Sequence, residues 1–490
     1  MLLSNGANPL SIGDVDECLP LHFAVRYRPS VIRATSSNPS TPNLNRMNGS
    51  PINDRITTVV TTSDDSFVET LYLLIEKTIE ASKEHRPIDL IDKYGDTALH
   101  YAVSRTNSRG AVILLEQGAN VNALNNQKLS PLHMAAKNGD LHILEVLLSY
   151  KADLSLRDED GSSPLHIAAK EGQVKHAEFL NQCFIALESE RVSFDGCTGE
   201  DSIVKAIVTQ DKNGANLLHC AVESGNEHLI NRIMNEDKKI EAIKLVNTKK
   251  QDGFTALHIA AEFGHYNIVK KLVRCQADLD VESCANETPL LLASKNNHYQ
   301  IAAYLARACP EAISNIDDDG LSPLLIAAKN GHTEVTEVLL ANGANVNDTD
   351  QAERNMVFLA AMEGNASYLN TILQRADIAS LINECDQYQN TPLHAAAKNG
   401  HKRALLSLIR AGANTSAKNV EEETAFHKAA KFGQNKILEE LNSIDSKLIN
   451  DGDSNKDTAL HLAAKGCHYK TVQLLIDLGA DVGKIDYIRI

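Results

Sequence analysis

The sequence predicts an all-α solenoid built from about twelve repeated pairs of short helices. Two observations indicate this fold. A short phrase of Thr or Ser, Pro or Ala, Leu and His, followed by small apolar residues, recurs twelve times along the 490 residues. With the fourth residue of each phrase as a marker, seven of the eleven intervals lie within one residue of 33. A repeat of this length buries its apolar face only against its neighbours, so we expect one elongated array over residues 1–490 instead of several globular domains.

The markers of the phrase are nine histidines and three apolar residues. In chain order they are His22, His100, His133, His166, His219, His258, Leu291, Leu325, Phe358, His394, His427 and His461.

Each phrase has the chemistry of a helix start. Its first position is Thr, Ser or Asn in eleven of the twelve repeats, with Leu19 the exception. These side chains accept a hydrogen bond from an N–H of the first turn, and the Pro that follows in six repeats has no N–H to leave unpaired. The first helix should end eight or nine residues later at a glycine such as Gly331. A second helix with an apolar stripe follows, and the polar stretches between repeats should form protruding β-hairpin loops.

The nine repeat histidines invite a metal-binding or catalytic interpretation. A histidine that recurs once per unit at one place in the first turn is better explained as a structural tie between that turn and the adjacent loop. Rings in neighbouring units would lie about 8 to 10 Å apart, too far to share a zinc ion whose ligand bonds are about 2 Å long. We therefore expect no catalytic residue, no metal site and no cofactor.

Three successive repeats depart from the phrase. They carry Leu291, Leu325 and Phe358 where the histidine stands elsewhere, which predicts a weaker polar tether between these units. Two interpretations remain open: neutral drift in the middle of a long array, or a softer junction at which the solenoid flexes.

Two insertions and the chain ends interrupt the period. Residues 28–66 are rich in Ser, Thr, Asn and Pro, which predicts a disordered loop, or alternatively a phosphorylation or docking element. A second insertion spans residues 181–204 and has no recognisable chemistry. Residues 1–8 match the end of a second helix, so they predict a partial repeat. We expect a fragment, an isoform or an incomplete form of a longer protein, with an unusual complete short protein as the alternative.

Composition narrows the class of partner. The formal net charge of −16 disfavours nucleic acid and anionic membrane surfaces. No run of 18 apolar residues and no signal peptide occur, which predicts a cytoplasmic chain without a membrane span. The short motifs of phosphate-binding loops, serine hydrolases and zinc proteases are missing, so we do not expect an enzyme.

Acidic loop tips are the candidate contacts with protein partners, and they favour basic surfaces. They are Asp158, Glu159, Asp160, Asp317, Asp318 and Asp319.

The fullest phrase, residues 391–401, resembles the signature of the ankyrin repeat. The final repeats, around residues 381–401 and 447–461, resemble in phrasing and loop length the ankyrin-type (subfamily A) transient receptor potential cation channels. The resemblance implies the N-terminal cytosolic ankyrin domain of a homotetrameric, non-selective, calcium-permeable cation channel with a sensory role, at the cytosolic face of the plasma membrane. Its partners would be other subunits or other proteins. The pore itself would lie outside these residues.

A second function class stays open. The same array would serve a cytosolic adaptor that links membrane proteins to the cytoskeleton or to signalling partners, because the scaffold does not reveal its ligand.

Overall fold

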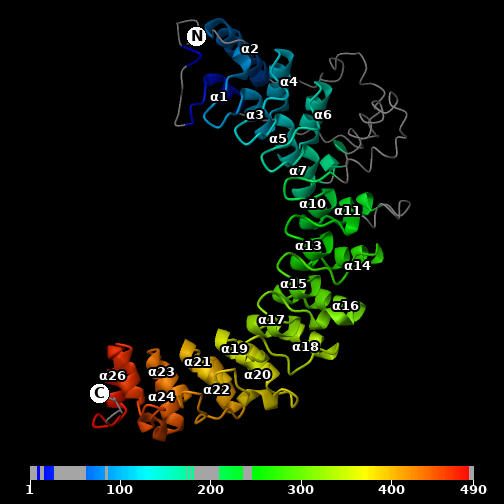
Figure 1. The fold of residues 1–490 in the computed structure, drawn as a ribbon. Helices are drawn as coiled ribbons and strands as arrows, with labels where there is room; N and C mark the ends of the chain where they lie inside the picture. Colours follow the sequence, from blue (N-terminus) through cyan, green and yellow to red (C-terminus); the bar gives the residue numbers. More distant parts are fainter. Residues whose placement is uncertain are drawn as a thin grey trace. The chain divides into compact units, whose positions relative to one another are not determined.

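Short helices joined by turns make up the part of the chain that the computed structural model describes (Figure 1). This part comprises residues 8–10, 16–26, 62–82, 86–138, 140–173, 175–177, 179–180, 209–234 and 245–484. Contacts divide the chain into two compact units, Met1–Leu245 with Lys249–Gln251 and Val246–Thr248 with Asp252–Ile490. None of the described helices is long and apolar enough to span a bilayer.

The described residues of the first unit form four complete helix pairs and one further first helix. They are α1 (Pro20–Arg26) with α2 (Thr62–Ala81), α3 (Ala98–Ser104) with α4 (Ser108–Glu116), α5 (Pro131–Asn138) with α6 (Leu141–Ser149), α7 (Pro164–Lys170), and α10 (Leu217–Glu223) with α11 (Glu227–Ile233). A 3₁₀ turn, η4 (Pro87–Asp89), precedes α3.

The second unit holds seven helix pairs. They are α13 (Ala256–Glu262) with α14 (Tyr266–Arg274), α15 (Pro289–Lys295) with α16 (Tyr299–Ala308), α17 (Pro323–Asn330) with α18 (Thr333–Ala341), α19 (Met356–Glu363) with α20 (Ala366–Ile372), α21 (Pro392–Asn399) with α22 (Lys402–Arg410), α23 (Ala425–Lys431) with α24 (Asn435–Ile444), and α25 (Ala459–Lys465) with α26 (Tyr469–Asp477). The 3₁₀ turns are η5 (Pro310–Ser314), η6 (Ala379–Asn383) and η7 (Ser446–Asn450).

The predicted helix starts are confirmed in all twelve repeats, because every first helix begins directly after the first residue of its phrase. In α17 the Ser322 side chain accepts the Leu325 N–H, and Pro323 takes the first helical position. Local sequence thus sets where each helix begins.

Alanine lets the first helices stack closely. In α17, for example, the two central alanines, Ala327 and Ala328, are at 0% exposure. Within each unit, a first helix contacts the first helix of the next repeat, as α17 does with α19 and α19 with α21. The second helices add larger side chains, such as Val335 and Leu339, to the same core. Small residues therefore bring backbones together on one side of the pair, and aliphatic residues fill the other.

The loops between repeats, here called the fingers, are closed by turns. In the finger of Asp386, one carboxylate oxygen accepts the N–H groups of Tyr388 at 2.9 Å and Asn390 at 2.7 Å. The only bridges among the described residues are Thr349–Asn355 and Gly452–Thr458. Side-chain acceptors thus hold the fingers where longer β-ladders would otherwise be needed.

The reversal between the two helices of a repeat uses left-handed backbone. Gly331 and Gly400, with φ of 75° and 77°, end their helices in this conformation. The last repeat differs, because Cys467 stands where the reversing glycine is expected and Gly466 comes directly before it. Gly466 has φ −77°, and Cys467 adopts φ 56° instead.

The predicted insertions fall almost wholly outside the described residues. Residues 28–61 and 181–204 are not described, and residues 62–66 form the first turns of α2. The partial repeat of residues 1–8 is described only at Asn8. The domain boundaries of the array therefore stay a prediction.

Two glycines of one repeat allow a test of how closely the fingers approach. Both have positive φ, but a Cβ on Gly95 would lie 2.7 Å from the Asn126 nitrogen, whereas one on Gly118 would meet nothing within 4 Å. Gly95→Ala should therefore lower the unfolding free energy by at least about 1 kcal/mol more than Gly118→Ala does. Urea denaturation followed by circular dichroism measures the difference. Equal losses would show that the finger yields without cost.

Candidate functional site

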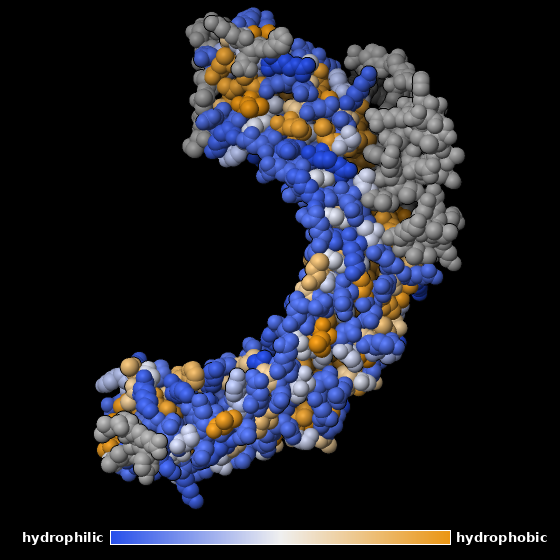
Figure 2. Space-filling view, viewed as in Figure 1, coloured by the Kyte–Doolittle hydropathy of each residue, from blue (hydrophilic) through white to orange (hydrophobic). Residues whose placement is uncertain are grey.

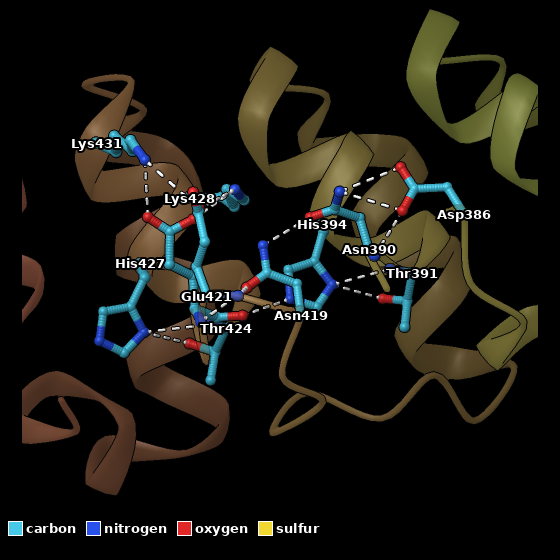
Figure 3. A network of polar contacts seen from close by, with 11 residues as sticks. Asp386, Asn390, Thr391, His394, Asn419, Glu421, Thr424, His427, Lys428 and Lys431 are labelled. Carbon is cyan, nitrogen blue, oxygen red and sulfur yellow. Dashed lines mark hydrogen bonds and ion pairs between the residues drawn. The ribbon is translucent and has the colours of Figure 1, made fainter. Parts of the chain in front are cut away.

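The repeat histidine ties one helix pair to the finger that leads into the next. In the repeat of His394, Nδ1 accepts the Thr391 N–H at 3.1 Å, and Thr391 Oγ1 lies 2.9 Å from the same nitrogen (Figure 3). On the other side, Nε2 lies 2.9 Å from the carbonyl oxygen of Glu423, the residue that precedes the next helix start. A carbonyl can only accept, so Nε2 carries the hydrogen and the ring is neutral. The ring closes a capping box in which histidine replaces the usual Glu or Gln.

The same contact recurs along the array. An Nε2 atom lies 3.0 to 3.2 Å from a backbone carbonyl of the next repeat in the pairs His22–Leu90, His100–Leu129, His133–Ser162, His166–Thr209, His258–Glu287 and His427–Asp451. His219 is buried against Asn216, and His461, in the last repeat, keeps its contact with Thr458 but is only half-buried. Among the described residues, no group of three or more His, Cys, Asp or Glu is placed to hold a metal ion.

Burial keeps these rings neutral. Desolvation lowers the pKa of His394 to about 4, although the hydrogen bond to the Glu423 carbonyl and the nearby carboxylates act in the opposite direction. Burial likewise lowers the pKa of His22, His100, His133, His166 and His427. A proton on Nδ1 would face the N–H that this nitrogen accepts, so charging the ring breaks the bond to the helix start, although Nε2 can still donate to the carbonyl of the next repeat.

Three repeats lack the ring, and only one of them replaces its function. Leu291 and Leu325 are buried at 1% exposure and offer no polar atom. In the third, Asn355 accepts the Phe358 N–H at 2.9 Å and donates to the Leu381 carbonyl at 3.2 Å. Asn355 therefore spans the two repeats as a histidine does elsewhere.

Neighbouring fingers are also joined by one backbone hydrogen bond each. The bonds run from Lys93 to Asp16, Asn126 to Tyr94, Glu159 to Gln127, Lys212 to Asp160, Gln251 to Asn213, Cys284 to Asp252, Gln387 to Ala352, Val420 to Tyr388 and Ser454 to Glu421, over 2.8 to 3.2 Å.

Two successive junctions lack this backbone bond. Asp318 and Gln351 occupy the same finger position as Cys284 and Gln387, so their N–H groups would be expected to donate to the preceding finger. Neither does so within the described residues. A side-chain bond from Asn286 to Asp318, 2.7 Å long, joins the first of these pairs of fingers. At these same two junctions the histidine contact is also missing, because Leu291 and Leu325 stand in its place.

At the opposite end of the helix pairs, side-chain contacts join neighbouring repeats of the second unit. The residue directly before the second helix contacts the end of the previous first helix in the pairs His298–Glu262, His332–Ser294, Asn365–Lys329, Gln434–Lys398 and His468–Lys431, at 2.7 to 3.1 Å. Between α19 and α21 the Asn399 side chain donates to the Met362 carbonyl at 2.8 Å instead. The two junctions are therefore held at the helix turns and by packing, and are loose only at the fingers.

The acidic finger tips divide into turn-forming and exposed residues. One Asp158 oxygen accepts the Asp160 and Ser162 N–H groups at 3.0 and 2.7 Å, and Asp317 accepts the Leu321 N–H at 2.8 Å. The side chains of Glu159, Asp160, Asp318 and Asp319 are exposed. Two of the six candidates thus build the finger, and partner contact by the other four stays a prediction.

Ion pairs at the finger base were not anticipated from the sequence. Glu423 is 1% exposed, and its carboxylate pairs with the ammonium groups of Lys428 and Lys431 of α23 (Figure 3). Burial alone would raise the pKa of Glu423, but the two lysines outweigh this effect and lower it to about 2. Glu287 with Lys295 and Asp457 with Lys465 repeat the arrangement with one lysine each. The available signal is an acidic residue directly before the helix-start Thr, with Lys eight positions later.

Hydrophobic residues are sparse on the visible face of the second unit in Figure 2. Between α13 and α26 they lie singly or in small groups among hydrophilic residues. Tyr388 and Val420, at adjacent finger tips, are 60% and 61% exposed.

The neutral ring predicts acid sensitivity. The pKa of His394 is about 4 in the folded chain and about 6.5 in the unfolded chain, so the neutral ring contributes its full stabilisation above pH 6.5. This contribution to the free energy of unfolding decreases as the pH falls towards 4, and about 2 kcal/mol of it is lost at pH 5. His394→Leu should be destabilised relative to the native chain at pH 7.5, because it leaves the Thr391 N–H and the Glu423 carbonyl unpaired. The gap between the two should shrink by about 2 kcal/mol at pH 5. Urea denaturation at both pH values measures it, and a gap that does not change with pH would contradict a buried neutral ring.

Hydrogen exchange can distinguish a softer junction from neutral drift. The Gln387 and Val420 amides, which donate to the preceding finger, should be protected. The Asp318 and Gln351 amides should exchange at least about tenfold faster, since no such acceptor faces them. Mass spectrometry of peptides that cover the four fingers gives the rates. Equal protection of all four would favour drift.

Comparison with known proteins agrees with this geometry. Sequence models of "Ankyrin repeats (3 copies)" match residues 111–188, 197–283, 275–350 and 404–486, and a model of "Ankyrin repeat" matches residues 94–126.

Similar proteins include channels. "Transient receptor potential cation channel subfamily A member 1" of Homo sapiens is 28% identical over 421 residues, which cover 80% of this chain and 37% of that protein. The protein of the same name in Drosophila melanogaster is 29% identical over 298 residues, 58% of this chain and 24% of that protein. The Caenorhabditis elegans homolog is 39% identical over 102 residues, 21% of this chain and 8% of that protein. The chain thus spans little more than a third of the human relative.

The family matches extend over more than half of the chain. They coincide with helix pairs that carry the histidine tie and with fingers that an Asp or Asn side chain closes. The chain therefore belongs to the ankyrin-repeat family.

Proposed function

We propose that this chain is a non-enzymatic protein-binding scaffold and that it forms the cytosolic arm of a transient receptor potential type cation channel. The observation that supports the channel assignment most is the similarity to the human subfamily A channel, because it covers 80% of this chain. The repeat phrase alone is common to ankyrin arrays, whereas this similarity extends over 421 residues at 28% identity.

The scaffold part of the proposal follows from the stack itself. Each repeat presents a finger and the first turn of a helix beside those of its neighbour, while the histidines, alanines and Asx turns are used up in holding the stack together. Variable residues on the fingers are therefore available for recognition, as in other repeat proteins. The partners would be other proteins, or the other subunits of a homotetrameric channel at the cytosolic face of the plasma membrane.

Long-read sequencing of the transcripts that encode these residues tests the channel assignment. We expect codons downstream of Ile490 for six apolar spans of about 20 residues each. A death domain or a spectrin-binding module in that place would indicate a cytosolic adaptor. A stop codon there in every transcript would exclude the channel.

A second measurement asks whether the encoded protein assembles. Cross-linking of detergent-solubilised membranes, followed by detection with an antibody against residues 402–410, should give a ladder that ends at four copies. A protein found only in the membrane-free fraction would contradict the proposal.

A further inference from the structure

A polar groove lies between the last two repeats of the second unit. It has a volume of about 360 Å³ and is lined by Glu421, Glu423, Lys431, Asp453, Asn455, Asp457, Leu462, Lys465 and Gly466. Four carboxylates and two ammonium groups face it, so the lining carries a net negative charge at neutral pH. This acidic groove comes from two fingers and from α23 and α25.

Two equivalent carboxylates lie at this groove, and they differ in how many cations they meet. Glu423 precedes the start of α23 and pairs with both Lys428 and Lys431. Asp457 precedes the start of α25 and pairs with Lys465 alone. The difference has a simple cause, because Leu462 stands in α25 at the place that Lys428 takes in α23.

The missing cation leaves a buried oxygen without a partner. The Asp457 side chain is 3% exposed, Oδ2 pairs with Lys465, and Oδ1 is buried without a hydrogen-bond donor. A buried carboxylate oxygen that no donor reaches is costly. Glu287, which also has one lysine, avoids this cost since its side chain is 19% exposed. Glu423 Oε2 is also buried without a hydrogen bond, but the Lys428 ammonium lies against it, whereas no cation lies against Asp457 Oδ1 among the described residues. Of the three carboxylates, Asp457 is thus the one with a buried oxygen that meets neither a hydrogen-bond donor nor a cation.

The neighbouring fingers indicate that the donor belongs to a polypeptide. Val420 directly precedes Glu421 of the groove, and its N–H bonds the carbonyl of Tyr388 on the adjacent finger at 3.1 Å. Both side chains are more than half exposed. The exposed apolar surface of Tyr388 and Val420 therefore lies beside a groove that attracts a positive charge. A peptide segment with an arginine flanked by aliphatic residues would complement both features.

We propose that the acidic groove binds an arginine side chain of a partner protein, whose guanidinium donates to Asp457 Oδ1 in the position that the Lys428 ammonium occupies beside Glu423. Glu421, whose side chain is 59% exposed, supplies a second carboxylate at the mouth of the groove. The assignment rests on the proposed scaffold function and specifies which chemistry the scaffold recognises. It does not depend on whether a channel follows.

Fluorescence anisotropy with a matched pair of peptides tests the proposal on the full chain. The probe is fluorescein-labelled Gly-Ser-Leu-Arg-Leu-Ser-Gly-amide, and its partner carries citrulline, a neutral isostere, in place of arginine. At low salt the arginine peptide should bind at least about tenfold more tightly than the citrulline peptide. Equal affinities, or binding of neither peptide, would overturn the proposal and leave Asp457 Oδ1 simply hydrated.

Variants locate the binding site. Asp457→Asn removes the charge, and Leu462→Lys supplies an internal cation where Lys428 stands in the preceding repeat. Each should reduce the preference for arginine to less than about twofold. Glu287→Gln, which alters the equivalent pair elsewhere in the array, should bind as the native chain does.

Thermal unfolding of each variant separates loss of the site from loss of the fold. If Leu462→Lys does not fold, the loss of arginine preference in Asp457→Asn still tests the proposal. If Glu287→Gln weakens binding as much as Asp457→Asn, the effect is general electrostatics and the proposal fails. Competition by CaCl₂ beyond that of NaCl at equal ionic strength would identify a metal ion as the occupant and would also overturn it. Failure of all these tests would leave the transcript test of the channel unaffected.

Discussion

The structure depends on an imidazole that must stay uncharged. His394 accepts a backbone N–H within its own helix start and donates to a carbonyl at the base of the next finger, and His22, His100, His133, His166, His258 and His427 make the same contact with a carbonyl of the next repeat. Both bonds require the same tautomer, and burial ensures it. The ring thereby fixes the finger relative to the helix, and the fixed finger base positions the next Thr or Ser that starts the following helix. One neutral side chain per unit thus transmits the register along the stack.

Contacts at the two ends of a helix pair have different tolerance to change. At the helix turns, His332, Asn365, Gln434 and His468 make equivalent contacts, so several residue types serve there. At the finger base, only histidine, or Asn355 in one repeat, spans the gap. Leucine in this place preserves packing but gives up the hydrogen bonds. The array thus tolerates a lost tie at one end because the other end remains closed.

Local chemistry made the helix starts predictable. Thr391, Pro392 and His394 act within one turn, so their roles can be inferred from spacing alone. Other features depend on residues about 30 positions away and could not be inferred in this way. Asn355 replaces a histidine only because the Leu381 carbonyl lies opposite it, and Cys467 turns left-handed although a glycine precedes it. The exchange of Lys428 for Leu462 gained meaning only when the burial of Asp457 was known.

If hydrogen exchange shows that the two junctions following Leu291 and Leu325 are softer, they give the second unit a mechanical property. In a stack where each repeat contacts only its neighbours, the junctions act as springs in series, and their compliances add. A load applied across the unit is the same at every junction, so the weakest ones stretch most. Pulling or twisting would thus be absorbed between residues 283 and 354, while the helix pairs on either side would move as stiff levers.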